Sequence, residues 1–495
     1  MMKRFKAIVS LMLALVLLAA PVSANPRQNV GIESYTYNLI GPGTFFAVPA
    51  PLPYRYSRSL YAGDLGVESL MHINEITYSN EQFFITNGSS IVVLDYNFNL
   101  IAEITGFYHD DVFEAFTTLD GIFVTHDTGE IYVAEPGAER VVHLDKEFNL
   151  IRTLGRPYGI PLSETFPWQP VKVAVDQNGR IYVIANNVFE GIVEINPDGT
   201  FNRYFGVVNV TYTVMDLFWR ALRTPAQRAR MALWLPTAFT NLTIDSDGFV
   251  FAVISEGNLD EPVRKLNARG ENILRRPSSD HFWGDNHNLM TTSFNTPQGP
   301  SILSHVHVTD FGVYYVFDRN RNRVFAYDDD GHMLFAFGGS GTREGLTQIV
   351  TGMAVSDTQL VLADRGNRSL EVFDLTVYGH NVLNAVYHQF HADWHSAAQY
   401  WRQVLDLNPY FQYAHLGIGR WYYRMGYFEE AIGHFQRAQN VTYFNMAYTR
   451  TRGAFFERHF NTIFIGILVF AALIAAYKIA KKNRLFSKQK RGLTA

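Results

Sequence analysis

The stretch that decides the fold is Asp176-Gln-Asn-Gly-Arg-Ile-Tyr-Val183, a polar turn that leads into a short apolar strand. Variants of this text recur along the chain at 80–85, 127–133, 245–252, 310–316 and 357–362. Spacings of 48, 50, 69, 64 and 46 residues separate the apolar anchors Phe84, Tyr132, Tyr182, Phe251, Tyr315 and Val361. A period in this range, carried by short strands and Asp/Gly turns, is typical of a β-propeller. The sequence therefore predicts a mainly β fold with six blades over residues 69–377.

Each repeat also contains a further apolar strand, usually followed by an acidic or Asn turn with glycine, as in Asp328-Asp-Asp-Gly331. Such turns favour hairpins. The pattern resembles the NHL repeat, whose strands flank an Asp-x-Gly-Asn-x-Arg turn; Asp364-Arg-Gly-Asn367 matches that turn in part. The resemblance implies an NHL-like propeller, although no single copy is complete.

The segment before the first blade, residues 25–68, is extended and rich in turns. Ser34–Leu39 alternates polar and apolar residues, as a strand does. A closed propeller must cover the edge where its first and last blades meet. We therefore predict that a strand within 34–62 pairs into the last blade and closes the ring.

After the propeller, residues 378–459 change to a helical pattern. Ala397, Trp401 and Pro409 match the tetratricopeptide consensus, and Ala431 and Phe435 repeat the first two 34 residues later. Period and positions agree, so we expect a small α-helical tetratricopeptide-like domain here. Its last helix should lead into the segment that follows.

Both ends of the chain carry apolar runs. Residues 1–24 combine a basic start, an apolar stretch and a small-residue cleavage site, as a secretory signal peptide does. Residues 460–480 contain an uncharged run, Phe460–Tyr477, that is long enough to span a bilayer. Seven Lys and Arg residues and no acid follow it, so we expect the tail, 481–495, to be cytoplasmic and the bulk of the chain to be extracellular. The predicted location is the cell membrane, with a single span.

Charge and composition exclude several functions. The net charge is −4, but the signal carries +3 and the tail from Lys478 onward carries +7, which leaves −14 for residues 25–477. Nucleic-acid binding needs clustered cations, so we exclude nucleic acid as the main ligand. The chain has no cysteine and therefore no disulfide and no thiolate site.

No motif specifies a reaction. The acids that recur once per blade, among them Asp176 and Asp245, lie in turns, where Asp usually accepts local backbone hydrogen bonds. His305 and His307 should share a face of one strand and could ligate a metal, but nothing fixes His281, Asp285 or His287 beside them. We expect no enzyme activity, no metal ion and no cofactor. The alternative is a tethered, lactonase-like propeller hydrolase or lyase with a central divalent cation.

Two insertions stretch the blade spacing, at 207–237 and 278–300, and insertions in repeat folds often map to one binding face. Their aromatic, basic and histidine side chains are our candidate ligand-binding residues: Trp219, Arg220, Arg223, Trp234, His281, Trp283 and His287. For docking of a partner on the helical repeats, the candidates are Tyr410, Tyr413, Trp421 and Tyr423. The competing interpretation is that these aromatic residues are core: a helix packed on the propeller rim, or the interior of the repeats.

Taken whole, the chain resembles a family of exported proteins of Gram-positive bacteria that share this order of parts. The resemblance is carried by Glu33–Tyr37 with Pro49–Pro51, Arg223–Arg228 before Pro236, Ala326–Gly331 and Leu405–Pro409. It implies a membrane-anchored binding or scaffold protein that is accessory to a carbohydrate ABC-transport system. The partners implied are a transporter permease or a solute-binding protein, with carbohydrate as a further ligand.

Overall fold

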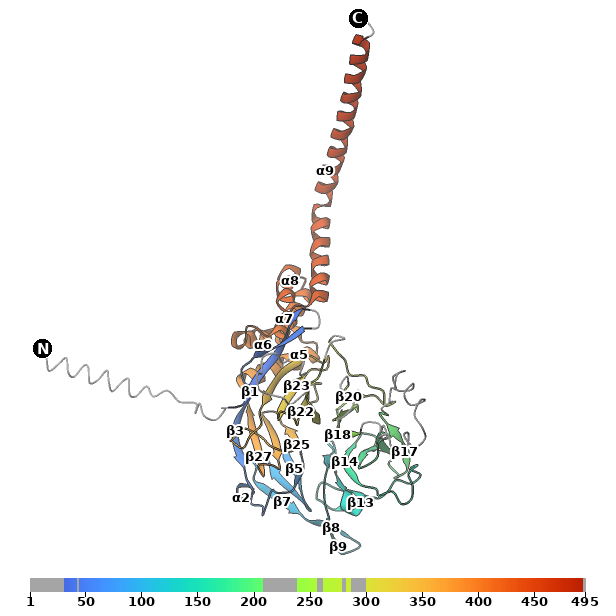
Figure 1. Cartoon of the computed structure of the whole chain (residues 1–495), viewed down its shortest axis with the longest axis vertical. Helices are drawn as coiled ribbons and strands as arrows, with labels where there is room; N and C mark the ends of the chain where they lie inside the picture. The colour runs from blue at the N-terminus through green and yellow to red at the C-terminus, as the bar shows by residue number, and fades with distance from the viewer. Residues whose placement is uncertain are drawn as a thin grey trace, which may run out of the picture.

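A computed structural model describes residues 31–41, 44–207, 238–255, 261–277, 282–285 and 300–492. Six antiparallel sheets surround one axis, a group of short helices follows, and one long helix projects away from both (Figure 1). This arrangement confirms the predicted fold class, a six-bladed β-propeller followed by a helical region with one long apolar helix. The predicted signal peptide lies outside the described residues.

The blades follow the order of the chain. Blades 1 and 2 contain β4 (Ile73–Ser79), β5 (Gln82–Asn87), β6 (Ser90–Asp95) and β7 (Leu100–Ile104), then β10 (Ile122–Val124), β11 (Ile131–Glu135), β12 (Arg140–Leu144) and β13 (Leu150–Leu154). Blades 3 and 4 contain β14 (Pro170–Val175), β15 (Ile181–Ala185), β16 (Ile192–Ile195) and β17 (Phe201–Phe205), then β18 (Phe239–Ile244), β19 (Val250–Ile254) and β20 (Val263–Leu266). Blades 5 and 6 contain β21 (Leu303–Val308), β22 (Tyr314–Asp318), β23 (Arg323–Tyr327) and β24 (Met333–Gly338), then β25 (Val350–Val355), β26 (Gln359–Asp364) and β27 (Ser369–Leu375). A small hairpin, β8 (Gly106–His109) and β9 (Val112–Ala115), follows blade 1.

The repeated text of the sequence corresponds to the turn between the first and second strands. In blade 3, Asp176 Oδ1 accepts hydrogen bonds from the backbone N–H groups of Asn178 at 2.9 Å and Arg180 at 3.0 Å. Gly179 supplies the positive φ, +74°, that this turn requires. The following strand, β15, is buried at all of its positions because neighbouring blades cover both of its faces. Burial on both faces explains why the strand is apolar throughout instead of alternating.

The ring closes between the two ends of the propeller. Strand β3 (Tyr54–Leu60), from the N-terminal segment, pairs antiparallel with β27 and completes blade 6. Tyr54 and Tyr56 on β3 are buried. The Tyr54 ring stacks on Phe337 of blade 5 at 5.4 Å, and its hydroxyl lies 3.0 Å from the Tyr315 hydroxyl. The closing strand is therefore part of the core as well as of the sheet.

The N-terminal segment also extends a different blade. Strand β1 (Glu33–Gly41) forms a hairpin with β2 (Thr44–Pro49) and pairs with β24, so blade 5 becomes a six-stranded sheet. The alternating stretch recognised in the sequence thus joins blade 5, whereas the strand after it joins the last blade. A short helix, α2 (Ala62–Leu65), and a 3₁₀ turn, η1 (Pro136–Ala138), lie between strands.

Four short helices follow the propeller: α5 (Val377–Phe390), α6 (Trp394–Leu407), α7 (Gln412–Arg424) and α8 (Phe428–Arg437). Small residues allow them to pack closely: a Cβ added at Gly417 would lie 2.3 Å from Trp401 Nε1, and one at Gly419 would lie 2.6 Å from Phe435. The long helix α9 (Val441–Gly492) continues from α8 without another sheet or domain between them and extends far from the propeller (Figure 1).

We predict that Tyr54→Ala destabilises the fold because it removes a fully buried ring from the closing strand. Truncation of a large buried aromatic residue costs about 3–5 kcal/mol of unfolding free energy. Tyr61→Ala, at a half-exposed position just beyond β3, is the matched control and should change stability by less than about 0.5 kcal/mol. Chemical denaturation of the purified full chain, followed by tryptophan fluorescence, measures both. Equal effects of the two substitutions would contradict closure through β3.

Candidate functional site

The first strands of five of the six blades share an irregularity that brings one residue of each to the axis. The strand pairing shifts just before Glu75 in blade 1, Lys172 in blade 3, Asn241 in blade 4, His305 in blade 5 and Gly352 in blade 6. Bulges of this kind re-aim side chains. Glu75 contacts both Lys172 and Asn241, from blades that are not its neighbours, so these side chains meet at the centre of the ring.

An ion pair occupies this centre. Lys172 Nζ donates to Glu75 Oε2 and lies 3.7 Å from Asp120 Oδ1, which precedes the first strand of blade 2. The Asn241 amide also approaches Glu75, with Nδ2 3.5 Å from Oε2, while Asn241 Oδ1 accepts from the backbone N–H of Val306 at 3.3 Å. We call Glu75, Asp120, Lys172, Asn241 and His305 the axial cluster.

Burial and charge set the protonation of this cluster. Burial by itself lowers the pKa of Lys172, but the Glu75 and Asp120 carboxylates outweigh it, and the pKa is raised above its ordinary value. Burial also raises the pKa of Asp120, against the opposing effect of Lys172. Burial lowers the pKa of His305 to about 3. His305 is therefore neutral at pH 7, and its Nε2–H donates to the Thr351 carbonyl at 2.7 Å.

Two glycines leave space for the ion pair. At Gly352 an added Cβ would lie 2.8 Å from Glu75 Oε1 and 2.6 Å from the Ile76 nitrogen. At Gly121, in blade 2, an added Cβ would lie 2.9 Å from the Cα of Lys172. These distances are shorter than a real Cβ atom tolerates, so only glycine fits at either position. The ring is therefore asymmetric, because a charged residue of one blade faces a glycine of the adjacent blade.

This arrangement bears on the central-cation alternative. A divalent cation on the axis needs carboxylates from several blades that are free to coordinate it. Here the two axial carboxylates already surround an ammonium group that the chain supplies itself. The cluster forms a largely buried polar network across the ring. Beside it, Arg365 Nη1 lies 3.5 Å from Asn74 Oδ1, which adds a second cation next to the axial cluster.

A second group of possible metal ligands lies at the periphery of blade 5. Asp328, Asp330 and His332 place one ligand atom each within 4.8 Å of one another. The protein already uses these groups: Tyr413 donates its hydroxyl to Asp328, and Arg275 lies 2.9 Å from an Asp330 oxygen. These contacts fit a junction between propeller and helices better than an ion site.

Most of the predicted ligand-binding residues fall outside the described part of the chain: Trp219, Arg220, Arg223, Trp234, His281 and His287. Trp283 is described and is buried in blade 5. Its Nε1–H donates to the Tyr314 hydroxyl at 2.9 Å, and the Arg276 guanidinium lies 5.1 Å from its ring centre. Trp283 is a core residue of the blade and is not displayed on a loop.

The predicted docking residues all lie in the helical region but differ in exposure. Tyr410 is 73% exposed, at the turn between α6 and α7. Tyr413 is buried, with its ring stacked on His332 at 4.5 Å, so the chain's own propeller is its partner. Trp421 is half-buried beneath Arg402, and Tyr423 packs on Phe428 within the short helices.

The histidine and acid set considered from the sequence is not assembled either. Asp285 is buried in blade 5, where the hydroxyls of Tyr35 and Tyr37 each donate to it at 2.6 Å and Arg323 lies at 2.9 Å. His305 lies in the axial cluster instead. Of the axial residues, sequence reasoning singled out only His305 and missed the others. A signal existed, because Lys172, Asn241 and His305 each stand ten positions before the anchor of their blade.

Comparisons with known proteins concern the fold. No protein-family model matches the chain, and no curated protein matches it. Among solved structures, a streptogramin B lyase matches with 12% identity and a TM-score of 0.37, over 71% of this chain and all of that one. Virginiamycin B lyase from Staphylococcus aureus matches with 11% identity and a TM-score of 0.38, over 65% of this chain and all of that one. Hydrazine synthase from Kuenenia stuttgartiensis matches with 12% identity and a TM-score of 0.36, over 62% of this chain and 96% of that one.

These matches correct one expectation. From the absence of reaction motifs we expected that the chain is not an enzyme; enzymes are named among the matching propellers, so that expectation is wrong and is withdrawn. A propeller provides a scaffold whose loops can be adapted to a reaction, and the fold by itself excludes none. At these identities the likeness concerns the fold alone and assigns no reaction.

We predict that Lys172→Met strongly destabilises the propeller, because it leaves the buried Glu75 carboxylate without its cation. Removing one partner of a buried ion pair costs about 3–5 kcal/mol. The double variant Lys172→Met/Glu75→Gln should recover most of that loss, since no unpaired charge remains. Lys146→Met, at an exposed lysine, is the control. Denaturation midpoints of these three variants, of Glu75→Gln alone and of the unmodified chain test this. A double variant whose loss equals the sum of the two single losses would contradict the axial ion pair.

Proposed function

We propose that this protein is a membrane-anchored extracellular binding and scaffold protein, accessory to a carbohydrate-type transport complex in the same membrane. The propeller would present one loop-rich face to a ligand, and the helical repeats would dock a membrane partner. The NHL-like character of the blades, the tetratricopeptide character of the helices and the extracellular position of the bulk are parts of this proposal.

One observation carries it: the propeller is joined to its candidate anchor without a flexible break. Helix α9 contains one candidate membrane span, and that apolar part is not buried against the rest of the described chain. The residues between the start of α9 and Phe460 are helical too. At 1.5 Å per residue they separate the short helices from the apolar run by roughly 28 Å. A protein built in this way holds a large domain at a set distance from a bilayer.

The order of parts supports docking near the membrane. The short helices lie between the propeller and α9, so they are the globular part nearest to the span (Figure 1). Tyr410 exposes most of its ring there, and aromatic side chains are enriched where proteins meet. The basic flank after the span supports a cytoplasmic tail, and hence a propeller outside the cell.

We predict that Leu468→Arg/Ala471→Arg releases the protein from the membrane. Each arginine at the centre of a span costs about 2.5–3.5 kcal/mol of insertion free energy. Phe456→Arg lies on the same helix before the apolar run and should leave the protein membrane-bound. Fractionation of cells into membrane and soluble parts measures the outcome. A double variant that stays in the membrane fraction through carbonate washing would count against the anchor.

Photo-crosslinking tests the docking role. A benzoylphenylalanine placed at Tyr410 should crosslink to another membrane protein in intact membranes. The same probe at Tyr108, which is 69% exposed on β8 at the far side of the propeller, is the matched control (Figure 1). Mass spectrometry identifies the product, and a transport component crosslinked from position 410 alone is the expected result. Recovery of the uncrosslinked protein alone from both positions would refute the proposed partnership.

A further inference from the structure

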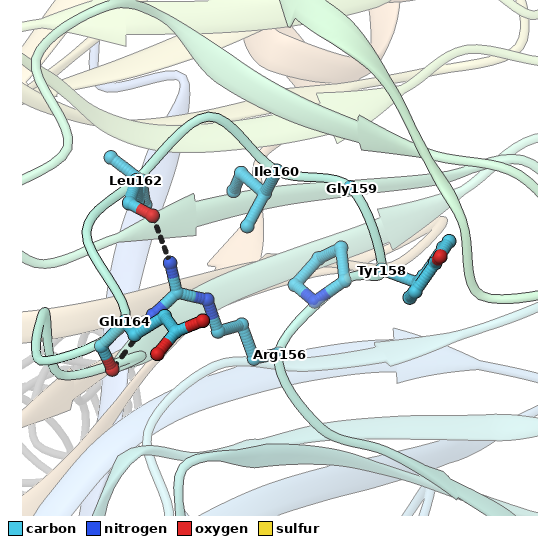
Figure 2. A pocket seen from close by; sticks show the side chains of 7 residues that line it. Arg156, Tyr158, Gly159, Ile160, Leu162 and Glu164 are labelled. Atoms are coloured by element: carbon cyan, nitrogen blue, oxygen red, sulfur yellow. Dashed lines mark hydrogen bonds between the residues drawn. The ribbon is translucent and has the colours of Figure 1, made fainter.

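A pocket lies at the junction of blades 2 and 3, in the connection between β13 and β14 (Figure 2). Its volume is about 430 Å³, and its lining residues come from the stretch Arg156–Glu164. Pockets that bind small molecules range over ~300–1,000 Å³. The pocket is distinct from the axial cluster, since none of the axial residues lines it.

The loop around the pocket is held rigid from within. The Arg156 guanidinium donates to the carbonyl oxygens of Leu162 at 2.5 Å and Glu164 at 3.4 Å (Figure 2). It also donates to the carbonyl oxygens of Ser163 at 2.8 Å and Phe166 at 3.2 Å. One side chain thus fixes the turn that forms one wall. A binding loop that is already ordered loses little conformational entropy when a ligand arrives.

The opposite side of the pocket carries an aromatic ring with open faces. The Tyr158 side chain is 84% exposed, and among the described residues it has no hydrogen-bond partner. Its backbone is nevertheless fixed against blade 3: Tyr158 N donates to the Gly199 carbonyl at 3.3 Å, and Phe201 N donates to the Tyr158 carbonyl at 2.9 Å. A large apolar ring on an anchored backbone, turned to solvent, is a preformed stacking surface.

The charges around the pocket select the kind of ligand. Arg156 and Glu164 contribute one charge of each sign to the lining of the pocket. Arg156 disfavours a cationic ligand, Glu164 disfavours an anionic one, and both terminal nitrogens of Arg156 already donate to carbonyls. What remains is an aromatic face, a carboxylate that accepts hydrogen bonds, and no net charge.

We propose that this pocket binds a neutral saccharide. The C–H face of a sugar ring would stack on Tyr158, while a hydroxyl of the same sugar would donate to the Glu164 carboxylate. An apolar face and a ring of hydroxyl donors on one uncharged molecule match the three features of the pocket. This inference rests on the proposed function, of which it specifies the ligand class and the binding site.

Saccharide titration tests the proposal on the purified full chain. Lauryldimethylamine oxide is a suitable detergent because it contains no sugar. Maltotetraose, cellotetraose and xylotetraose are the probes, with tetramethylammonium and inorganic phosphate as charged competitors, and saturation-transfer NMR reports contact and affinity. We expect at least one tetrasaccharide to bind and neither ion to displace it.

Three variants locate the site. Tyr158→Ala should weaken saccharide binding about tenfold or more, which corresponds to about 1.4 kcal/mol. Tyr158→Phe should retain it, since stacking needs the ring and not the hydroxyl, and Glu164→Gln should weaken it several-fold. Tyr108→Ala, at another exposed aromatic residue, on β8, should leave saccharide binding unchanged.

The proposal is overturned if none of the three saccharides binds, if Tyr158→Ala binds as well as the unmodified chain, or if an ion binds the pocket in preference to sugar. These results leave the membrane-release and crosslinking tests unaffected. Conversely, saccharide binding that depends on Tyr158, together with a failed crosslink at position 410, would sustain the site and refute the transport partnership.

Discussion

A single apolar core joins the propeller to the helix that carries its candidate anchor. The core begins with Phe337 and Phe373 in blades 5 and 6, passes through Tyr378 and Trp401 of the short helices, and ends at Ala447 on α9. All of these residues are buried. Because these residues belong to one continuous buried cluster, the helices cannot swing relative to the blades without opening the core. The orientation of the propeller relative to α9 follows from this packing.

Polar contacts at the same junction add directional hydrogen bonds to the apolar packing between propeller and helices. The side-chain amide of Gln412 pairs with the Leu39 backbone as a residue of a neighbouring strand would. Its Oε1 accepts from Leu39 N at 2.7 Å, and its Nε2 donates to the Leu39 carbonyl at 2.9 Å. Asn38 Nδ2 donates to the Tyr410 carbonyl at 2.8 Å. Hairpin β1–β2 therefore pairs with blade 5 along one edge and clamps the turn before α7, so the N-terminal segment serves both parts of the molecule.

The blades could be predicted because their strands are buried on both faces and their turns use local chemistry. Both features depend on only a few consecutive residues, as in Asp176–Val183. The pairing of β1 with β24 could not be predicted, because it depends on tertiary proximity of segments about 300 residues apart. The same holds for the axial cluster. A single polar residue early in an apolar strand does not reveal that it faces five other strands across an axis.

In the helical region, the consensus positions did not predict which aromatic side chains are exposed. Tyr410 and Tyr413 are only three residues apart, yet the Tyr410 side chain is mostly exposed and the Tyr413 side chain is buried against Asp328 and His332. Only the docked propeller distinguishes them. Exposed surfaces on these short helices can therefore be assigned only once the neighbouring propeller is placed.

The absence of cysteine allows the central claim, a propeller held outside the cell on one membrane-crossing helix, to be measured directly. Single cysteines introduced as Glu147→Cys, at an exposed position after β12, and Ser487→Cys, after the apolar run, can be labelled in intact cells with a membrane-impermeant maleimide. The account predicts labelling at position 147 in intact cells and at position 487 only after permeabilisation. Labelling of position 487 in intact cells, or protection of position 147, would contradict it.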